Sequence, residues 1–135
     1  MMAKYLLDTN ICVFFLRGKK QIVEKILSNG IANCFISEVT VAELLYGVEC
    51  DETNSNENRR KVSELIDILP IVPITNALQE WASQKSILRK KGELIDDLDL
   101  FIGATAIVNN MILVTDNEKH LKRLANIKLE NWVKS

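Results

Sequence analysis

The chain has 135 residues, of which 47% are apolar and 26% charged, and its formal net charge is −1. This composition is typical of a globular protein and predicts one domain over residues 1–135. No apolar run could cross a bilayer and no signal peptide opens the chain, which predicts a cytoplasmic protein without a membrane partner. The balanced charge argues against binding nucleic acid by bulk charge. Three cysteines without a C-x-x-C pair indicate neither a disulfide framework nor a zinc site.

The first half of the chain alternates between apolar runs and helical periodicity. Its expected elements are, in order, a strand over residues 4–7, a helix after Asp8-Thr9-Asn10, a helix over about residues 19–29 ending at Gly30, a strand over residues 32–36 and a helix that Ser37 caps. In the last of these helices, Glu43 shares a stripe with Val39 and Tyr46, so an acid lies on a largely apolar face. Residues 49–58 are polar, lack an apolar period and predict an exposed loop.

The second half repeats this alternation. Its expected elements are, in order, a helix ending at Pro70, a strand over residues 71–74, a helix that Thr75 caps and Gly92 ends, a helix from near Asp96 to residues 109–110, a strand over residues 111–115, a short helix after Asn117 and a strand over residues 127–129. Pro73 indicates a sheet edge, because proline cannot donate to the ladder. Alternating strands and helices predict a three-layer α/β/α sandwich with a central, mainly parallel sheet.

Four acids are expected near the carboxyl edge of that sheet. Asp8 and Asp116 each follow a predicted strand, and such strand ends are where parallel α/β sheets form their sites. Glu43 lies on the helix after the second strand, and Asp99 lies near a helix start, at the edge of a face that is expected to be buried and includes Leu98, Ile102 and Thr105. Carboxylates gathered in a cleft repel one another unless a cation compensates, and oxygen ligands favour Mg²⁺ or Mn²⁺. The four acids therefore predict a metal-dependent nuclease, in which the ion activates water against a phosphodiester.

Each acid also has a purely structural interpretation. Helix capping or the helix dipole would explain the acids at helix starts, which are Asp8, Asp96, Asp97 and Asp116. An exposed stripe would explain Glu43. The joint placement of these acids at one sheet edge favours the metal site over separate explanations.

Other catalytic chemistries find few suitable residues. The only histidine, His120, is expected on a helix surface, which excludes a two-histidine ribonuclease. The glycines form neither a G-x-G-x-x-G motif nor a phosphate-binding loop, which argues against kinases and dehydrogenases. Basic runs at residues 59–61, 89–91 and 119–123 are candidates for contact with phosphates, although any one of them alone is more typical of a solvated helix face.

Five sequence blocks contain or flank these acids. They are LLDTN at residues 6–10, SEVTVAELLYG at 37–47, IDDLDLFIGATA at 95–106, LVTDN at 113–117 and LENW at 129–132. Taken in this order, they resemble the PIN-domain family and, within it, the VapC-type toxins of bacterial type II toxin–antitoxin pairs. The resemblance implies a compact α/β/α fold and Mg²⁺-dependent endoribonuclease activity.

The resemblance also implies roles for individual residues. The family's acidic quartet matches Asp8, Glu43, Asp99 and Asp116. Asp8 and Asp99 would bind the metal ion, while Glu43 would bind it directly or through water and help to position the nucleophile. Asp116 would bind the ion or orient one of its ligands. The supporting residues are Thr9, Asn10 and Thr115, as hydrogen-bond partners, with Asp96 and Asp97 as secondary candidates.

Partners are implied by the same resemblance. A cognate VapB-like antitoxin would cover the cleft and an adjoining apolar groove, whose candidate lining is Phe14, Phe15, Leu16, Leu45 and Tyr46. The chain would form a homodimer and cut a structured RNA, such as tRNA or ribosomal RNA. Two alternatives are a non-catalytic PIN-like module that binds RNA or protein, and a nuclease of the same mechanism that processes RNA or cuts DNA outside a toxin system. The intact quartet argues against the first, because a binding module has no need for four mutually repelling acids.

Overall fold

Five parallel strands form the central sheet of the computed structural model, which describes residues 2–53 and 55–134. In chain order they are β1 (Tyr5–Leu7), β2 (Cys34–Ser37), β3 (Ile71–Val72), β4 (Ile112–Val114) and β5 (Leu129–Glu130). Across the sheet they follow the order β3-β2-β1-β4-β5, and every neighbouring pair is parallel. Strand β1 is therefore central, and β3, which Pro73 follows, lies at an edge as predicted.

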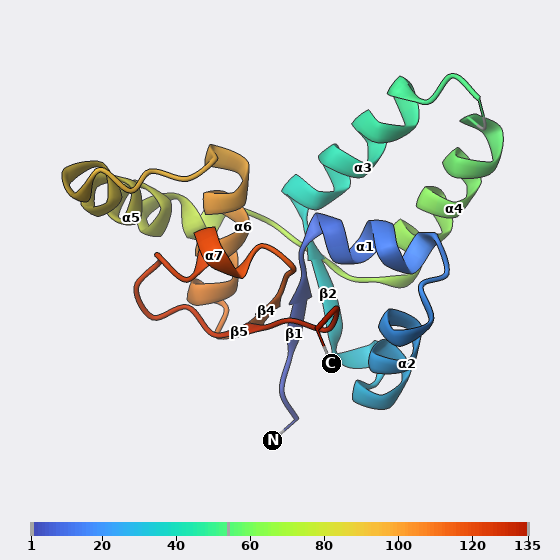
Figure 1. Ribbon diagram of the computed structural model, residues 1–135, viewed down its shortest axis with the longest axis horizontal. Coiled ribbons are helices and arrows are strands. Elements are labelled where there is room, and N and C mark those ends of the chain that lie inside the picture. The colour runs from blue at the N-terminus through green and yellow to red at the C-terminus, as the bar shows by residue number, and fades with distance from the viewer. Residues whose placement is uncertain (1, 54, 135) are drawn as a thin grey trace.

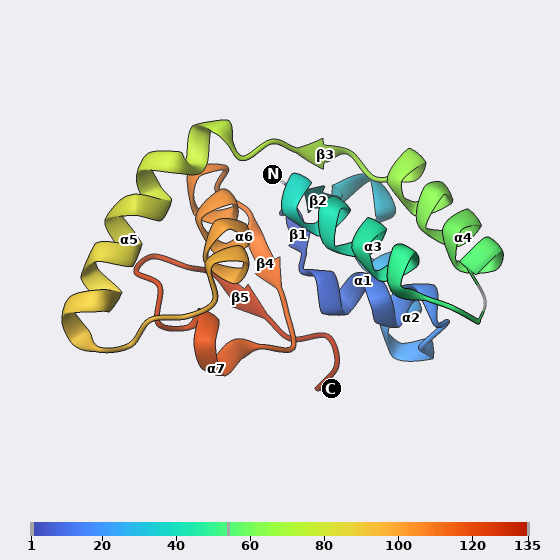
Figure 2. The ribbon, with the colours of Figure 1, turned by 90° about the horizontal axis from the view of Figure 1, so that it is seen from above.

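Helices cover both faces of this sheet. They are α1 (Thr9–Leu16), α2 (Lys20–Asn29), α3 (Glu38–Cys50), α4 (Ser55–Ile68), α5 (Leu78–Lys91), α6 (Asp97–Val108) and α7 (Glu118–Leu121). Helices α1 to α4 lie to one side of the sheet and α5 to α7 to the other (Figures 1 and 2). The predicted three-layer α/β/α fold is thus confirmed. None of the helices in the described part of the chain is long and apolar enough to cross a membrane.

Strand β1 supplies both hydrophobic cores, because successive side chains of a strand point to opposite faces. Tyr5 and Leu7 pack in the core on the α1 to α4 side, where the buried ring of Trp132 lies 5.2 Å from the ring of Tyr5. Leu6 packs in the core on the other side, where Trp81 of α5 stacks on Phe101 of α6 with ring centroids 4.6 Å apart. The end of β1 is consequently fixed from both faces.

The polar stretch at residues 49–58 was predicted as a loop, and within the described residues this prediction is confirmed only for residues 51–53. Helix α3 continues to Cys50, and α4 begins already at Ser55. Glu49 and Cys50 of α3, and Asn56 and Glu57 of α4, are exposed to solvent, so these helix ends need no apolar period. An ion pair between Arg59 and Glu49, with 3.0 Å between Nη2 and Oε1, links the two helices instead.

Two other boundaries are shifted by short 3-10 turns. Thr75 begins such a turn rather than capping a helix, and α5 begins at Leu78 without a side-chain cap. The strand predicted over residues 32–36 begins only at Cys34, because Ile31–Asn33 form another 3-10 turn.

Several predicted helix ends are confirmed. The hydroxyl of Ser37 accepts a hydrogen bond from the N–H of Val39 at the start of α3. Gly92 ends α5 in the left-handed conformation, with φ of 67°, which glycine adopts without strain. Asp96 caps α6, so this helix begins and ends close to the predicted boundaries.

Candidate active site at the carboxyl edge of the sheet

Asp8 occupies the innermost position of the site. It directly follows β1 and caps α1, where one carboxylate oxygen accepts a hydrogen bond from the N–H of Thr9 at 2.8 Å. The other oxygen accepts a hydrogen bond from the hydroxyl of Thr115 at 2.7 Å. The residue is only 3% exposed. Burial raises the pKa of Asp8, the two hydrogen bonds lower it, and the charge of Glu43 raises it again, so that the net shift is upward.

Glu43 is held beside Asp8 by Thr9, whose backbone N–H also binds Asp8. The hydroxyl of Thr9 donates to Glu43 Oε1 at 2.6 Å. This hydroxyl also lies 3.1 Å from the hydroxyl of Thr40, which therefore donates to Thr9. Thr9 thus serves two carboxylates, one through its backbone and one through its side chain, and it ties the start of α1 to α3.

Asp99 lies half-buried in the first turn of α6. Burial, followed by the charges of Asp8, Asp96 and Glu43 in that order, raises its pKa to about 6. The side-chain amide of Asn117 donates to Asp99 Oδ2 at 3.3 Å. Carboxylates from three separate elements are therefore close enough for the charge of Glu43 to raise the pKa of Asp8, and for the charges of Asp8 and Glu43 to raise the pKa of Asp99.

Asp116 lies at the rim of this group and is exposed. Its backbone N–H donates to Asn10 Oδ1 at 3.3 Å, and its carboxylate accepts a hydrogen bond from the amide of Asn131 at 3.2 Å. Thr115, rather than Asp116, is the residue that directly follows β4, so the acid is set one residue beyond the strand end.

The two acids at the start of α6 have structural roles. The Asp96 carboxylate accepts hydrogen bonds from the N–H groups of Leu98 at 2.9 Å and Asp99 at 3.4 Å, which caps the helix. The Asp97 carboxylate forms an ion pair with Lys85 of α5, with 2.8 Å between Oδ1 and Nζ. Asp97 thus connects α6 to α5, whereas the charge of Asp96 still raises the pKa of Asp99.

The prediction that Leu98 shares a buried face of α6 is wrong, because its side chain is 44% exposed. Ile102 and Thr105, from the same predicted face, are fully buried. The first turn of α6 therefore lies beyond the core that covers the later turns.

Sequence reasoning missed three polar residues of the site. Thr40 supports Thr9, and Asn131 donates to Asp116. Asn117 was predicted as a helix cap, but it makes no side-chain capping bond to α7 and donates to Asp99 instead. The position of Asn117 at a helix start predicted a bond to the backbone of α7. A single sequence contains no pattern that would pair Asn117 with Asp99 instead, because the two residues belong to different elements.

The donor atoms at this edge fit a hard divalent cation. Asp8, Glu43 and Asp99 offer carboxylate oxygens, and oxygen ligands suit Mg²⁺ or Mn²⁺. Burial first, and then the charges of neighbouring carboxylates, raise the pKa values of Asp8 and Asp99, and a bound cation would favour the charged form of both. Within residues 2–53 and 55–134, no three acidic, cysteine or histidine side chains are already gathered closely enough to enclose an ion.

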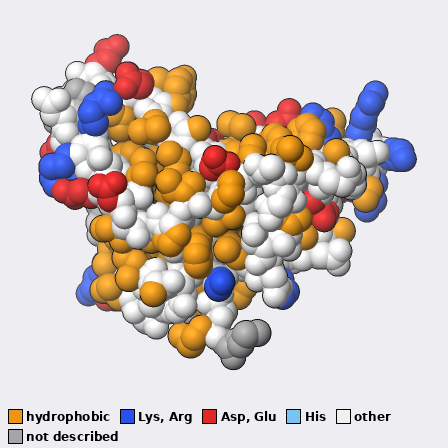
Figure 3. All heavy atoms as spheres, turned by 180° about the vertical axis from the view of Figure 1, so that it is seen from behind, with side chains coloured by type: hydrophobic (Ala, Val, Ile, Leu, Met, Phe, Trp, Pro, Cys, Tyr) orange, Lys and Arg blue, Asp and Glu red, His pale blue; other side chains and the backbone are white. Residues whose placement is uncertain are grey.

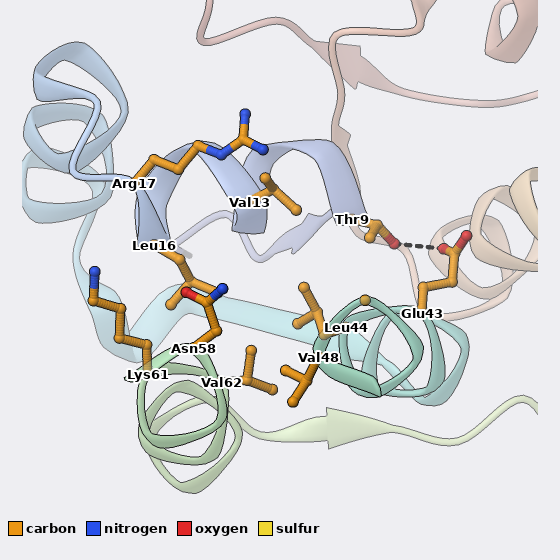
Figure 4. A pocket seen from close by; sticks show the side chains of 11 residues that line it. Thr9, Val13, Leu16, Arg17, Glu43, Leu44, Val48, Asn58, Lys61 and Val62 are labelled. Atoms are coloured by element: carbon orange, nitrogen blue, oxygen red, sulfur yellow. Dashed lines mark hydrogen bonds between the residues drawn. The ribbon is translucent and has the colours of Figure 1, made fainter. Parts of the chain in front are cut away.

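A groove of about 270 Å³ opens beside Glu43, between α1, α3 and α4 (Figure 4). Its apolar lining consists of Val13, Leu16, Leu44, Val48 and Val62. Its polar lining includes Arg17, Asn58 and Lys61, and Thr9 and Glu43 belong both to the groove and to the acidic site. A molecule seated in this groove would therefore reach the carboxylate of Glu43.

The predicted lining of the groove is only partly correct. Leu16 does line it, whereas Phe14 and Phe15 pack partly buried against the core. Leu45 and Tyr46 are 45% and 72% exposed on α3 and lie outside the groove.

Comparison with known proteins gives consistent matches over almost the whole chain. The family model described as the PIN domain matches residues 5–127. The ribonuclease VapC2 of Haemophilus influenzae is 33% identical over 137 residues, covering 98% of this chain and 100% of the relative. The tRNA(fMet)-specific endonuclease VapC of Salmonella typhimurium is 27% identical over 132 residues, covering 97% and 99%. The crystal structure of VapBC2 from Rickettsia felis, bound to a DNA fragment from their promoter, matches with a TM-score of 0.88 and 32% identity over 95% of this chain and 98% of that chain.

Proposed function

The chain belongs to the PIN-domain family and, within it, to the VapC-type ribonuclease toxins, and on that premise we propose that it hydrolyses a structured RNA, such as a tRNA, with bound Mg²⁺ or Mn²⁺. The observation that supports this proposal best is the group formed by Asp8, Glu43 and Asp99 at one sheet edge, where burial and neighbouring carboxylates raise the pKa values of Asp8 and Asp99. A tRNA is favoured because the Salmonella typhimurium relative is a tRNA(fMet)-specific endonuclease.

We assign the site residues as follows. Asp8 and Asp99 hold the metal ion, which when bound lowers the pKa of a water molecule and neutralises charge on the phosphate. Oε1 of Glu43 accepts a hydrogen bond from the hydroxyl of Thr9, so we assign the other carboxylate oxygen, Oε2, to orienting the attacking water. Asp116, exposed at the rim, orients a ligand of the ion from outside. Thr115 and Asn117 keep Asp8 and Asp99 in place through the hydrogen bonds described above.

The first experiment is sequencing of RNA ends after partner-free protein has been incubated with total cellular RNA. Wild type is compared with Asp99→Asn, each with Mg²⁺ and with EDTA. Cuts that need both Mg²⁺ and Asp99 are expected, and their position identifies the substrate. Melting temperature shows that the variant is folded. No cuts by folded wild type would favour a non-catalytic module or a DNA substrate.

We further propose that a VapB-like antitoxin fills the groove beside Glu43. The apolar floor, with Leu16 and Leu44, and the cationic side chain of Arg17 at the rim suit an amphipathic segment that carries acidic residues. The Rickettsia felis structure contains VapB and VapC together. Leu16→Glu should weaken antitoxin binding, measured by calorimetry, while Ile68→Glu, at an exposed residue of α4 outside the groove lining, should not.

The remaining proposals concern assembly and location. Leu45 and Tyr46 on α3 and Leu98 on α6 expose apolar surface, which supports a homodimer formed through these side chains. Tyr46→Ser should shift the mass measured by light scattering toward the monomer. We also propose that residues 1–135 form one nuclease domain that acts in the cytoplasm, where tRNA is found.

A further inference from the structure

The three basic runs of the sequence differ in how their charges are used. In α4, each cation faces a glutamate: Arg59 with Glu49 (3.0 Å), Arg60 with Glu64 (2.9 Å) and Lys61 with Glu57 (3.5 Å). Acidic and basic side chains alternate at that end of the molecule (Figure 3). These positive charges are largely neutralised by their own neighbours.

The other two runs keep their charge and lie next to each other. Their cations, here called the basic ridge, are Arg89, Lys90 and Lys91 at the end of α5 and Lys119, Lys122 and Arg123 in and after α7. Among the described residues, none of the six forms an ion pair. Arg123 joins the runs, because its Nη1 donates to the carbonyl groups of Glu93 at 3.2 Å and Leu94 at 3.3 Å, just beyond α5.

A helix dipole accounts for only part of this arrangement. Cations in the last turn of α5 are favoured by its carboxyl end. That effect does not explain why a second cationic run, on another element, is tied to the same place. The acids nearest in sequence are Glu93 and Glu118, and Glu118 already forms an ion pair with Lys134 (3.8 Å), so the six cations keep an excess of positive charge.

The basic ridge lies beside the acidic site. The segment after α5 leads directly into the first turn of α6, which carries Asp99, and α7 begins two residues after Asp116. Figure 2 shows the segment that runs from the end of α5 into α6, with α7 near the point where this segment enters α6. The groove beside Glu43 is lined by residues of α1, α3 and α4, and these helices lie on the other side of the sheet from α5 and α7 (Figure 2).

An RNA backbone that approaches three carboxylates is repelled by their charge. The protein therefore needs cationic side chains that lie next to the acidic site without being part of it. Contacts with phosphates position a nucleic acid without reading its sequence, and they supply much of the affinity. We propose that the basic ridge is the surface on which RNA docks, with phosphates that flank the cut site lying along α5 and α7. The groove beside Glu43 is thereby left to a protein partner. This inference rests on the proposed ribonuclease function.

The test compares two variants that lose the same charge. The ridge variant is Lys90→Gln/Lys91→Gln/Lys122→Gln, and the control is Lys25→Gln/Arg59→Gln/Arg60→Gln. Anisotropy of a short fluorescein-labelled single-stranded RNA is measured in EDTA from about 50 to 200 mM KCl. The ridge variant should bind roughly tenfold to a hundredfold more weakly, and its log–log salt slope should fall by about 2, since each phosphate contact contributes about 0.7. The control should change affinity by less than about threefold.

Equal losses in both variants would mean that bulk charge alone matters, and unchanged binding by the ridge variant would mean that RNA docks elsewhere; either result overturns the proposal. Loss of polyglutamate binding with RNA binding intact would assign the ridge to an acidic peptide and overturn it too. Cleavage of the same RNA by wild type with Mg²⁺ is measured separately. Binding that depends on the basic ridge, without cleavage, would contradict the proposed ribonuclease function but support RNA docking on the ridge. Cleavage together with binding that does not depend on the ridge would support the ribonuclease function but overturn the docking proposal.

Discussion

Asp8 and Asp116 follow neighbouring parallel strands at the same edge of the sheet, yet one is buried at the centre of the site and the other is exposed at its rim. The difference arises from one residue. Asp8 directly follows β1, whereas Thr115 takes the equivalent place after β4 and turns its hydroxyl toward Asp8. The strand end therefore decides the edge at which an acid lies, and the intervening residue decides its depth and its partners.

The largest expected effect separates the two acids by activity. Asp8→Asn should lower the rate of RNA cleavage roughly a thousandfold or more, because the amide loses the charge that holds the ion. Asp116→Asn should lower it only about tenfold, since its carboxylate lies outside. Single-turnover kinetics at saturating Mg²⁺ measure both. Equal losses would show that depth does not divide the roles of these acids.

The inner acids should also affect the stability of the protein, in the presence and in the absence of Mg²⁺. Mg²⁺ at a hundredfold excess over its dissociation constant should stabilise the wild type by about 2.7 kcal/mol. Asp99→Asn should lose this gain, yet melt no lower than wild type in EDTA, because a repelling charge has been removed from a half-buried position. Scanning calorimetry measures both quantities. Full Mg²⁺ stabilisation of Asp99→Asn would remove Asp99 from the ligand set.

A smaller effect tests the residue that creates the difference. Thr115→Val keeps the shape of the side chain but removes the hydrogen bond to Asp8, and we expect cleavage about 10-fold to 100-fold slower. Stability should fall by about 1–3 kcal/mol, because a buried carboxylate loses a donor. The matched control is Thr75→Val, at an exposed position away from the site. Unchanged cleavage in Thr115→Val would mean that Thr9 alone positions Asp8.

The smallest effect belongs to the rim. Asn131→Ala removes the donor to the Asp116 carboxylate, which remains solvated, so cleavage should slow by less than about tenfold. Asn117→Ala, by contrast, removes the donor to Asp99 and should cost more. Rates measured across a Mg²⁺ titration compare the two. A larger loss in Asn131→Ala would reverse the assignment of centre and rim.

Local sequence patterns were sufficient to predict the parallel sheet, the edge position of β3 and the acids at the carboxyl edge of the sheet. They did not reveal the order of the strands, which places β4 beside β1 and so brings Thr115 to Asp8. The extent of α3 and α4 was missed because their facing ends are held by an ion pair rather than by an apolar period. The partner of Asn117 was missed because a helix-start pattern says nothing about residues from another element.

The two tryptophans have a practical consequence. Trp132 is buried against Tyr5 in the core on the α1 to α4 side, far in sequence from α6. The indole N–H of Trp81 donates to the carbonyl of Asp97 at 3.3 Å, two residues before Asp99. In protein carrying Trp132→Phe, the fluorescence of the single remaining indole would follow events at the first turn of α6, so ion binding could be observed optically without an attached dye.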